Sequence, residues 1–146
     1  MAAALAVALL AAACSSGPIA EPPLDPECEV RFAAPQGFAP LDPLEVDYPD
    51  HVGLRLGFRD ADRREFHVFA GIPGEFGEGL PDAGELPMSE GRTGLLLGDR
   101  TVWVLTWLEE DVCDPRAVLG SGFSRKGFLE MLAEAGLREP AAEPSG

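Results

Sequence analysis

Carboxylates are the side chains best placed to do chemistry in this chain, because 25 of its 146 residues are Asp or Glu and only two are His. Glu65 and His67 are spaced to share one strand face, but two ligands do not make a zinc site, so we expect a solvated face. Asp60 and Asp62 lack the glycine and the terminal glutamate of a calcium loop. The denser run over residues 109–114 (EEDVCD) suits either calcium or a solvated loop.

Motifs for nucleophilic or phosphate chemistry are incomplete. Gly120-Ser121-Gly122 has the wrong spacing for the nucleophile elbow of a hydrolase. Gly77-Glu78-Gly79 does not complete a phosphate-binding loop. Carboxylate pairs suited to glycoside hydrolysis cannot be picked out by sequence among so many acids. The sequence therefore predicts no catalytic, cofactor-binding or metal-binding residue, and no cofactor.

Cys14 is the residue whose surroundings predict a specific modification. It follows Ala11-Ala12-Ala13 at the end of an uncharged apolar run and precedes the polar residues 15–17. This arrangement resembles the export signal of bacterial lipoproteins. In that family a peptidase cuts ahead of the cysteine, whose thiol and new amine then carry acyl chains, palmitate among them. The resemblance implies a signal peptide over residues 1–13 and a lipidated Cys14 at the mature N-terminus.

Length supports export independently of this resemblance. An apolar run of about 13 residues is too short for a hydrocarbon core that needs ~20, but it suits a signal peptide. We expect the protein on the outer side of the cell membrane, with secretion or a plain Ala-rich tail as alternatives. The abundance of Ala, Gly, Pro, Leu and Arg is typical of a GC-rich genome. The chain resembles the small lipoproteins of unassigned function in high-GC Gram-positive bacteria.

Cys28 and Cys113 remain as an even pair once Cys14 is assigned to lipid, in a compartment where disulfides persist. A bridge would close a loop of about 85 residues and add on the order of 4–5 kcal/mol. It would require Cα atoms about 4.4–6.8 Å apart. Two buried thiols are the alternative. Metal binding is less favoured, because neither cysteine has a second Cys or His at ligand spacing.

Composition and charge bound the remaining possibilities. With 46% hydrophobic residues, the 146-residue chain can build one core but hardly two. The formal net charge of −14 argues against nucleic acid, whose binding requires neutralising phosphates with Lys and Arg. It also argues against electrostatic adhesion to anionic lipid. The membrane partner is therefore expected through the acyl chains on Cys14 alone.

Proline and polar residues mark the borders of the folded part. Residues 14–26 are predicted to be a lipidated tether and residues 139–146 a disordered tail, leaving 27–138 as the domain.

Within that domain, alternation of apolar and polar residues predicts strands. Two hairpins are expected, 52–59 with 65–70 and 93–97 with 101–108, and shorter strands at 29–33 and 44–48. Residues 101–108 are apolar on both faces, which favours a central strand.

One helix is marked by an N-cap at Ser124, apolar residues at three- and four-residue spacing, and a stop at Gly136. A further helical turn is expected from Asp114 to Gly120, because Pro115 suits a first helical position. The predicted fold class is α+β: an antiparallel sheet of four to six strands with one C-terminal helix packed on it.

Two surface features are candidates for recognition. Residues 71–91 form a long Gly- and Pro-rich acidic segment, and loops of this length are often functional. Its Phe76 and Leu80 are expected to fold back onto the sheet or to contact a partner. Arg55 and Arg59 lie on the outer face of the first hairpin. We expect them either to bind an anionic partner or to form ion pairs with nearby carboxylates.

The function expected from these observations is that of a binding or accessory module anchored outside the cytoplasm, and not an enzyme. Its partner would be another envelope protein or a small ligand. The alternative is a small extracytoplasmic hydrolase that uses carboxylates, which would need a cleft with convergent acids.

Overall fold

The strand expected at the centre, β7 (Val102–Trp107), pairs on one side with β6 (Thr93–Asp99) and on the other with β8 (Arg116–Ser121). The computed structural model describes residues 28, 30–48, 52–71 and 77–140. The predicted signal peptide, the tether with Cys14 and most of the tail lie outside them.

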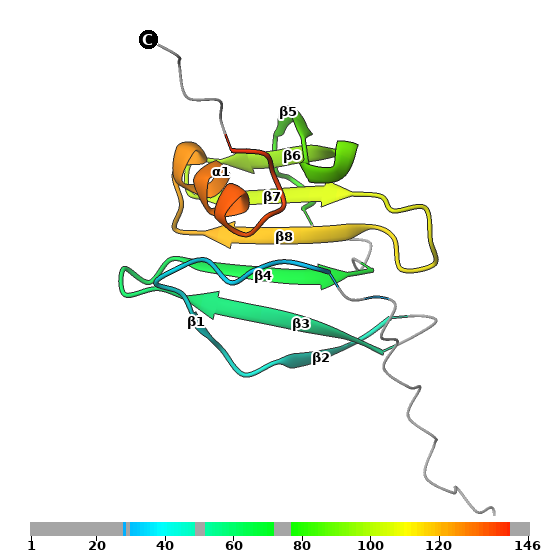
Figure 1. Ribbon diagram of the computed structural model, residues 1–146, viewed down its shortest axis with the longest axis horizontal. Helices are drawn as coiled ribbons and strands as arrows, with labels where there is room; N and C mark the ends of the chain where they lie inside the picture. The colour runs from blue at the N-terminus through cyan, green and yellow to red at the C-terminus, as the bar shows by residue number, and fades with distance from the viewer. Residues whose placement is uncertain (1–27, 29, 49–51, 72–76, 141–146) are drawn as a thin grey trace, which may run out of the picture.

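A single antiparallel sheet organises the described residues (Figure 1). Its strand order is β1-β3-β4-β8-β7-β6-β5, and β2 also pairs with β3. The sheet has eight strands, more than the four to six expected, while the predicted α+β class with one C-terminal helix is confirmed. The remaining elements are β1 (Ala39–Pro40), β2 (Leu44–Asp47), β3 (Val52–Arg59), β4 (Glu65–Ala70), β5 (Asp82–Pro87), a 3-10 turn (Ser89–Gly91) and α1 (Arg125–Glu134).

Both predicted hairpins are present, and β8 joins them. β4 pairs with β8 from Glu65↔Ser121 to Ala70↔Arg116, so the hairpin β3–β4 continues directly into the strands β8, β7 and β6. This register places apolar residues of the two strands opposite one another on the face toward α1. Phe66 lies opposite Gly120, and Val68 lies opposite Val118.

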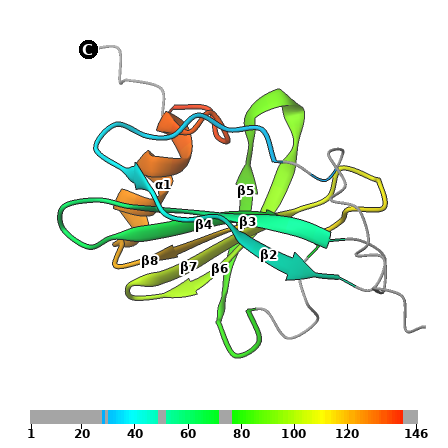
Figure 2. The same cartoon turned by 90° about the horizontal axis from the view of Figure 1, so that it is seen from below.

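The core lies between this face and α1 (Figure 2). The helix buries Phe128, Met131 and Leu132 against the sheet. Beside it, Phe32 packs edge-on to Phe58, and Phe38 packs in the same way on Phe66. Phe32 and Phe38 precede β1, so the N-terminal segment and the helix together cover this face of the sheet.

The predicted helix boundaries are confirmed. The side chain of Ser124 accepts a hydrogen bond of 3.0 Å from the Gly127 N–H, which satisfies a donor of the first turn. Gly136 has φ +76°, the left-handed conformation that ends helices at least cost when the residue is glycine. No helix among the described residues is long and apolar enough to cross a membrane.

The helical turn expected from Asp114 to Gly120 is wrong, because residues 116–121 form β8. The Pro that resembled a helix start instead precedes the strand. Ala117 and Val118 are completely buried between β4 and β7. Pairing on both sides outweighs the local signal, which carries no information about neighbouring strands.

Two further expectations are corrected. Residues 71–91 are not one long loop, since β5 pairs with β6 along the edge of the sheet and buries Leu86. Its pattern was hidden by Gly84, which has φ +102° next to a register shift. The short strand expected at 29–33 is also absent from described residues 30–33, although Val30 and Phe32 pack against the core.

Gly120 of β8 lies directly beneath Phe128 of α1, and it gives a test of this packing. A Cβ at Gly120 would lie 2.5 Å from Phe128 Cδ2, far inside contact distance. Gly120→Ala is therefore expected to lower the free energy of unfolding by about 1–3 kcal/mol through overpacking. Urea unfolding measures this change. Ser121→Ala, at an exposed neighbouring position, is the matched control, and an equal effect of both variants would contradict the proposed close packing.

Candidate functional site

Cys28 and Cys113 form a disulfide in the structure, with Cα atoms 5.1 Å apart, inside the range predicted for a bridge. Both residues are buried, and Ala70 packs beside them. The bridge attaches the beginning of the described domain to the loop between β7 and β8. No group of three or more potential metal ligands is found among the described residues.

A buried arginine organises that loop. Arg116 is the first residue of β8, and its side chain turns to the core face, where the residue is only 2% exposed. Its Nη1 donates to Asp111 at 2.9 Å and to Asp114 at 2.9 Å, and its Nη2 donates to Asp111 at 2.7 Å. The two carboxylates offset much of the free-energy cost of burying this guanidinium. Without a partner, the same charge would be too costly to bury.

The same carboxylates hold the backbone of the loop. Asp114 accepts hydrogen bonds from the N–H groups of Glu109 at 2.8 Å and Asp111 at 3.0 Å. Asp111 accepts one from the Cys113 N–H at 2.9 Å. The acidic run, expected to be a calcium loop or a solvated loop, is thus an internally bonded loop built around Arg116.

The two carboxyl groups of this region whose pKa is shifted stay ionised, because both pKa values are lowered. The hydrogen bond from Arg116 holds the pKa of Asp111 below its ordinary value. The hydrogen bond from the Trp107 indole, together with one from Arg92, lowers the pKa of Glu109. A general acid needs a raised pKa, so Glu109 and Asp111 are suited to ion pairing rather than to donating a proton.

A polar hollow of about 650 Å³ opens beside this cluster. It lies where residues 31–33, the turn 89–92 and the end of α1 face the acidic loop. Arg92 donates to Glu109 at 2.7 Å on its wall, and its guanidinium lies 5.9 Å from the Trp107 ring centre. Most charged side chains of this hollow are paired with one another. Its polar lining is suited to the recognition of a polar ligand.

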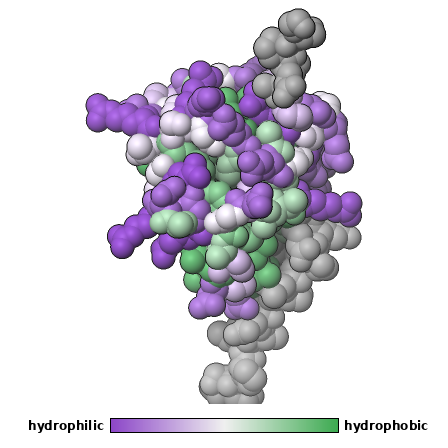
Figure 3. All heavy atoms as spheres, turned by 60° about the vertical axis from the view of Figure 1, so that its left-hand side comes forward, coloured by the Kyte–Doolittle hydropathy of each residue, from purple (hydrophilic) through white to green (hydrophobic). Residues whose placement is uncertain are grey.

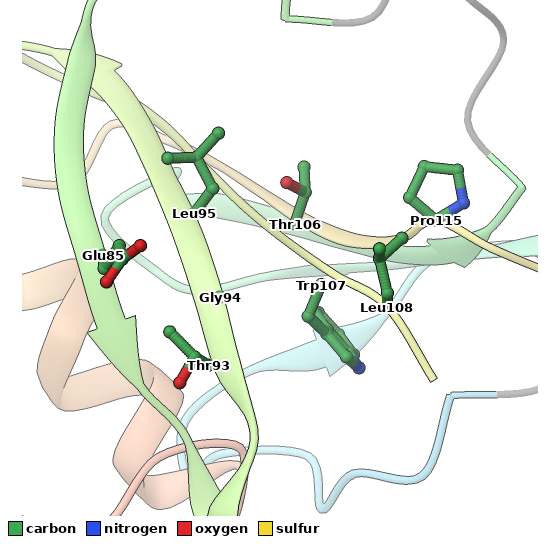
Figure 4. A pocket seen from close by; sticks show the side chains of 8 residues that line it. All are labelled: Glu85, Thr93, Gly94, Leu95, Thr106, Trp107, Leu108 and Pro115. Atoms are coloured by element: carbon green, nitrogen blue, oxygen red, sulfur yellow. The ribbon is translucent and has the colours of Figure 1, made fainter. Parts of the chain in front are cut away.

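An apolar hollow of about 510 Å³ lies on the opposite sheet face, across β5, β6 and β7 (Figure 4). Leu95 is 40% exposed and Leu108 65% exposed at its walls. Thr93 and Thr106 also line it, while the missing side chain of Gly94 faces the core, where a Cβ would meet Leu105 and Met88. Such a surface can take an apolar group, but it contains no reactive cluster.

The residues predicted as a partner surface are spread over the sheet. Arg59 is paired with Glu65 on the neighbouring strand, as expected if the arginines answer carboxylates. Arg55 is half-buried, and its Nε has no hydrogen-bond partner among the described residues. Leu80 precedes Pro81, whose carbonyl accepts from Gly98 at the end of β6, four positions from β3 in the strand order. Phe76 lies outside the described residues.

Sequence reasoning missed Arg116. The available signal was an arginine at the start of an apolar run, directly after a cluster of acids. A charge inside a buried pattern must be paired, and the only dense source of opposite charge nearby was the run over residues 109–114.

Comparison of the chain with protein-family models, curated proteins and solved structures finds no match. The functional argument therefore rests on the residues themselves.

Arg116 provides a stability test of this cluster. Arg116→Met removes the buried guanidinium and leaves Asp111 and Asp114 without their partner. Loss of one member of a buried pair costs 3–5 kcal/mol, and because these carboxylates are partly exposed we expect about 2–3 kcal/mol. Urea unfolding measures the change. Arg59→Met, in the exposed pair with Glu65, should cost less than ~1 kcal/mol, and equal losses would show that the loop does not depend on Arg116.

His67 provides a pH test of the first hairpin. Burial, the nearby Arg55 and Arg59 lower its pKa, while Glu65 acts in the opposite direction. The unfolded chain therefore takes up a proton near pH 6.5 before the folded chain does, and stability falls as the pH drops from about 7 to 5. His67→Gln should flatten this part of the curve of unfolding free energy against pH. An unchanged slope would show that the histidine is not responsible. The lowered pKa values of Asp60, Glu109 and Asp111 affect stability only in a more acidic range.

Proposed function

We propose that this protein is a lipoprotein anchored on the outer side of the cell membrane, where its domain acts as a binding or accessory module. The observation that carries the proposal is the Cys28–Cys113 disulfide, which leaves Cys14 as the one cysteine outside the bridge. Disulfides persist outside the cytoplasm and are rare inside it. The bridge and the export signal thus point to one compartment by independent chemistry.

Acyl chains on Cys14 would supply the membrane affinity. Each buried methylene contributes ~0.8 kcal/mol, so two or more chains hold a protein on a bilayer in a stable way. Residues 15–27 have a covalent reach of at most roughly 45 Å at ~3.5 Å per residue. The domain would therefore stay close to the membrane surface, with its Cys28 end nearest to the anchor.

A binding role is favoured over hydrolysis by the state of the carboxylates. Those in the polar hollow, Glu109 and Asp111, are bonded to Arg92 and Arg116 and have lowered pKa values. The described surfaces offer a polar hollow and an apolar one, both suited to recognition. Neither Glu109 nor Asp111 fits the general acid that the hydrolase alternative requires.

Cys14→Ser tests the anchor. In a bacterium that processes lipoproteins, the parent should fractionate with membranes and its N-terminal peptide should carry the mass of acyl chains. The variant should be released or remain unprocessed, because serine cannot form the thioether. Membrane fractionation and mass spectrometry of the N-terminal peptide measure both results.

The matched control is the double variant Cys28→Ser/Cys113→Ser, which keeps Cys14 but cannot form the disulfide. It should remain with the membranes while its free energy of unfolding falls. If Cys14→Ser fractionates like the parent with an unmodified N-terminal mass, the lipoprotein proposal is wrong.

A further inference from the structure

Three separately held segments meet at the polar hollow. The chain before β1 is fixed to the end of α1, because the Ala33 N–H donates to the Ala135 carbonyl at 3.0 Å. The 3-10 turn is fixed just beyond the helix, because the Ser89 N–H donates to the Leu137 carbonyl at 3.1 Å. Arg116 holds the third segment, the acidic loop. The walls of the hollow are therefore preformed, which reduces the entropy lost when a ligand binds.

Several charged groups on the lining are already engaged by the fold. Arg92 donates to Glu109 at 2.7 Å and, through Nε, to the Ser89 carbonyl at 3.0 Å. Both carboxylate oxygens of Asp111 accept hydrogen bonds from Arg116. These pairs give the hollow fixed charges of both signs, but most of their bonding capacity is used within the domain.

Other groups on the lining keep their bonding capacity for a ligand. Arg31 is exposed, and its guanidinium forms no hydrogen bond or ion pair with the described residues. The side chain of Glu90 is 82% exposed, and its ion pair with Arg92 Nη2 is long at 3.7 Å. Glu109 accepts from both Arg92 and the Trp107 indole on Oε1, which leaves Oε2 for another donor. One hollow thus combines a spare cationic donor with spare anionic acceptors.

The end of α1 adds partial negative charge to the hollow. Ala135 and Gly136 belong to its lining, so the helix ends at this site. Aligned peptide dipoles give a helix C-terminus roughly half a negative elementary charge, which favours a nearby cation. The last turn of α1 contains no basic residue that would offset this charge. A ligand cation therefore gains from the helix end as well as from the carboxylates.

We propose that the polar hollow binds a small zwitterion, which is a free amino acid or a short peptide with free ends. The ligand carboxylate pairs with Arg31, whose forked guanidinium matches carboxylate geometry. The ligand ammonium donates to Glu90 and to Glu109 Oε2. Three arginines and three carboxylates line the hollow, so a ligand that carries both charges gains more than one with a single charge. This inference names a ligand class for the proposed binding role and rests on that role.

The test uses the full chain carrying Cys14→Ser, so that binding is measured without lipid. Alanine and alanyl-alanine are the probes, and the tighter of the two distinguishes an amino acid from a peptide. Titration followed by ¹H–¹⁵N NMR measures affinity, with the N–H groups of Ala33 and Gly136 and the Trp107 indole as reporters. The N-acetyl form, which lacks the ammonium, and the C-amide form, which lacks the carboxylate, should each bind at least about fivefold more weakly.

Charge-removing variants assign the two ends of the ligand. Arg31→Gln should weaken binding of the uncapped probe at least about fivefold. It should leave the affinity of the C-amide form unchanged, because that form has no carboxylate to lose. Glu90→Gln should weaken the uncapped probe by a smaller factor, about threefold, because Glu109 shares the ammonium. It should leave the affinity of the N-acetyl form unchanged.

The matched control is Arg63→Gln/Glu45→Gln, which removes one exposed charge of each sign outside the hollow. The β3–β4 turn that carries Arg63 lies at the end of the sheet that comes forward in Figure 3, where hydrophilic side chains stand out from the surface. This control should bind the probes as the parent does.

Several results would overturn the proposal. These are absence of binding of both probes, equal affinity for capped and uncapped forms, equal weakening in the control, or shifts confined to Leu95 and Leu108 at the apolar hollow. None of these outcomes depends on acylation, so failure here is separable from failure of the membrane anchor.

Discussion

The buried guanidinium of Arg116 is the constraint on which the disulfide end of the domain depends. β8 is paired on both sides, so its first core-facing position cannot turn toward solvent. A charge at that position must be paired, and Asp111 and Asp114 are brought to it. The same two carboxylates accept from backbone N–H groups, which fixes the loop and places Cys113 for its bond to Cys28. One ion-pair cluster thereby determines where the chain enters the domain.

Features governed by local pattern could be predicted from the sequence. Alternation located both hairpins, and two apolar faces identified β7 as central because such a strand needs neighbours on either side. Ser124 and Gly136 marked α1 through the backbone groups that a helix leaves unsatisfied at its ends. The cysteine pairing followed from counting, since assigning Cys14 left only two. Cys14 itself, Phe76 and the partner remain predictions.

The missed elements depend on contacts between distant residues. Asp114-Pro115-Arg116 has the local appearance of a helix start, yet β8 gains pairing to both β4 and β7, which no local window contains. β5 was hidden among turn-forming residues because its Gly84 occupies a register shift at the sheet edge. Even at one hairpin turn the sequence did not separate Arg59 and Arg64, which reach carboxylates, from Arg63, which does not, because the side-chain directions depend on the backbone of the turn.

Net charge describes the whole chain, whereas a ligand meets one surface. The antiparallel topology sends alternate turns to opposite ends of the sheet, so the signs of charge in successive turns can be sorted in space without changing their sum. Here both signs occur in each of three turns: Asp60, Asp62, Arg63 and Arg64 lie between β3 and β4, Asp99 and Arg100 lie at the β6–β7 turn, and Glu90 and Arg92 lie between β5 and β6. Pairing then removes part of each set, as Arg64 with Asp60 and Arg92 with Glu109 show. A partner meets only the charged side chains that remain unpaired at each end of the sheet. Strand order determines which these are as much as composition does.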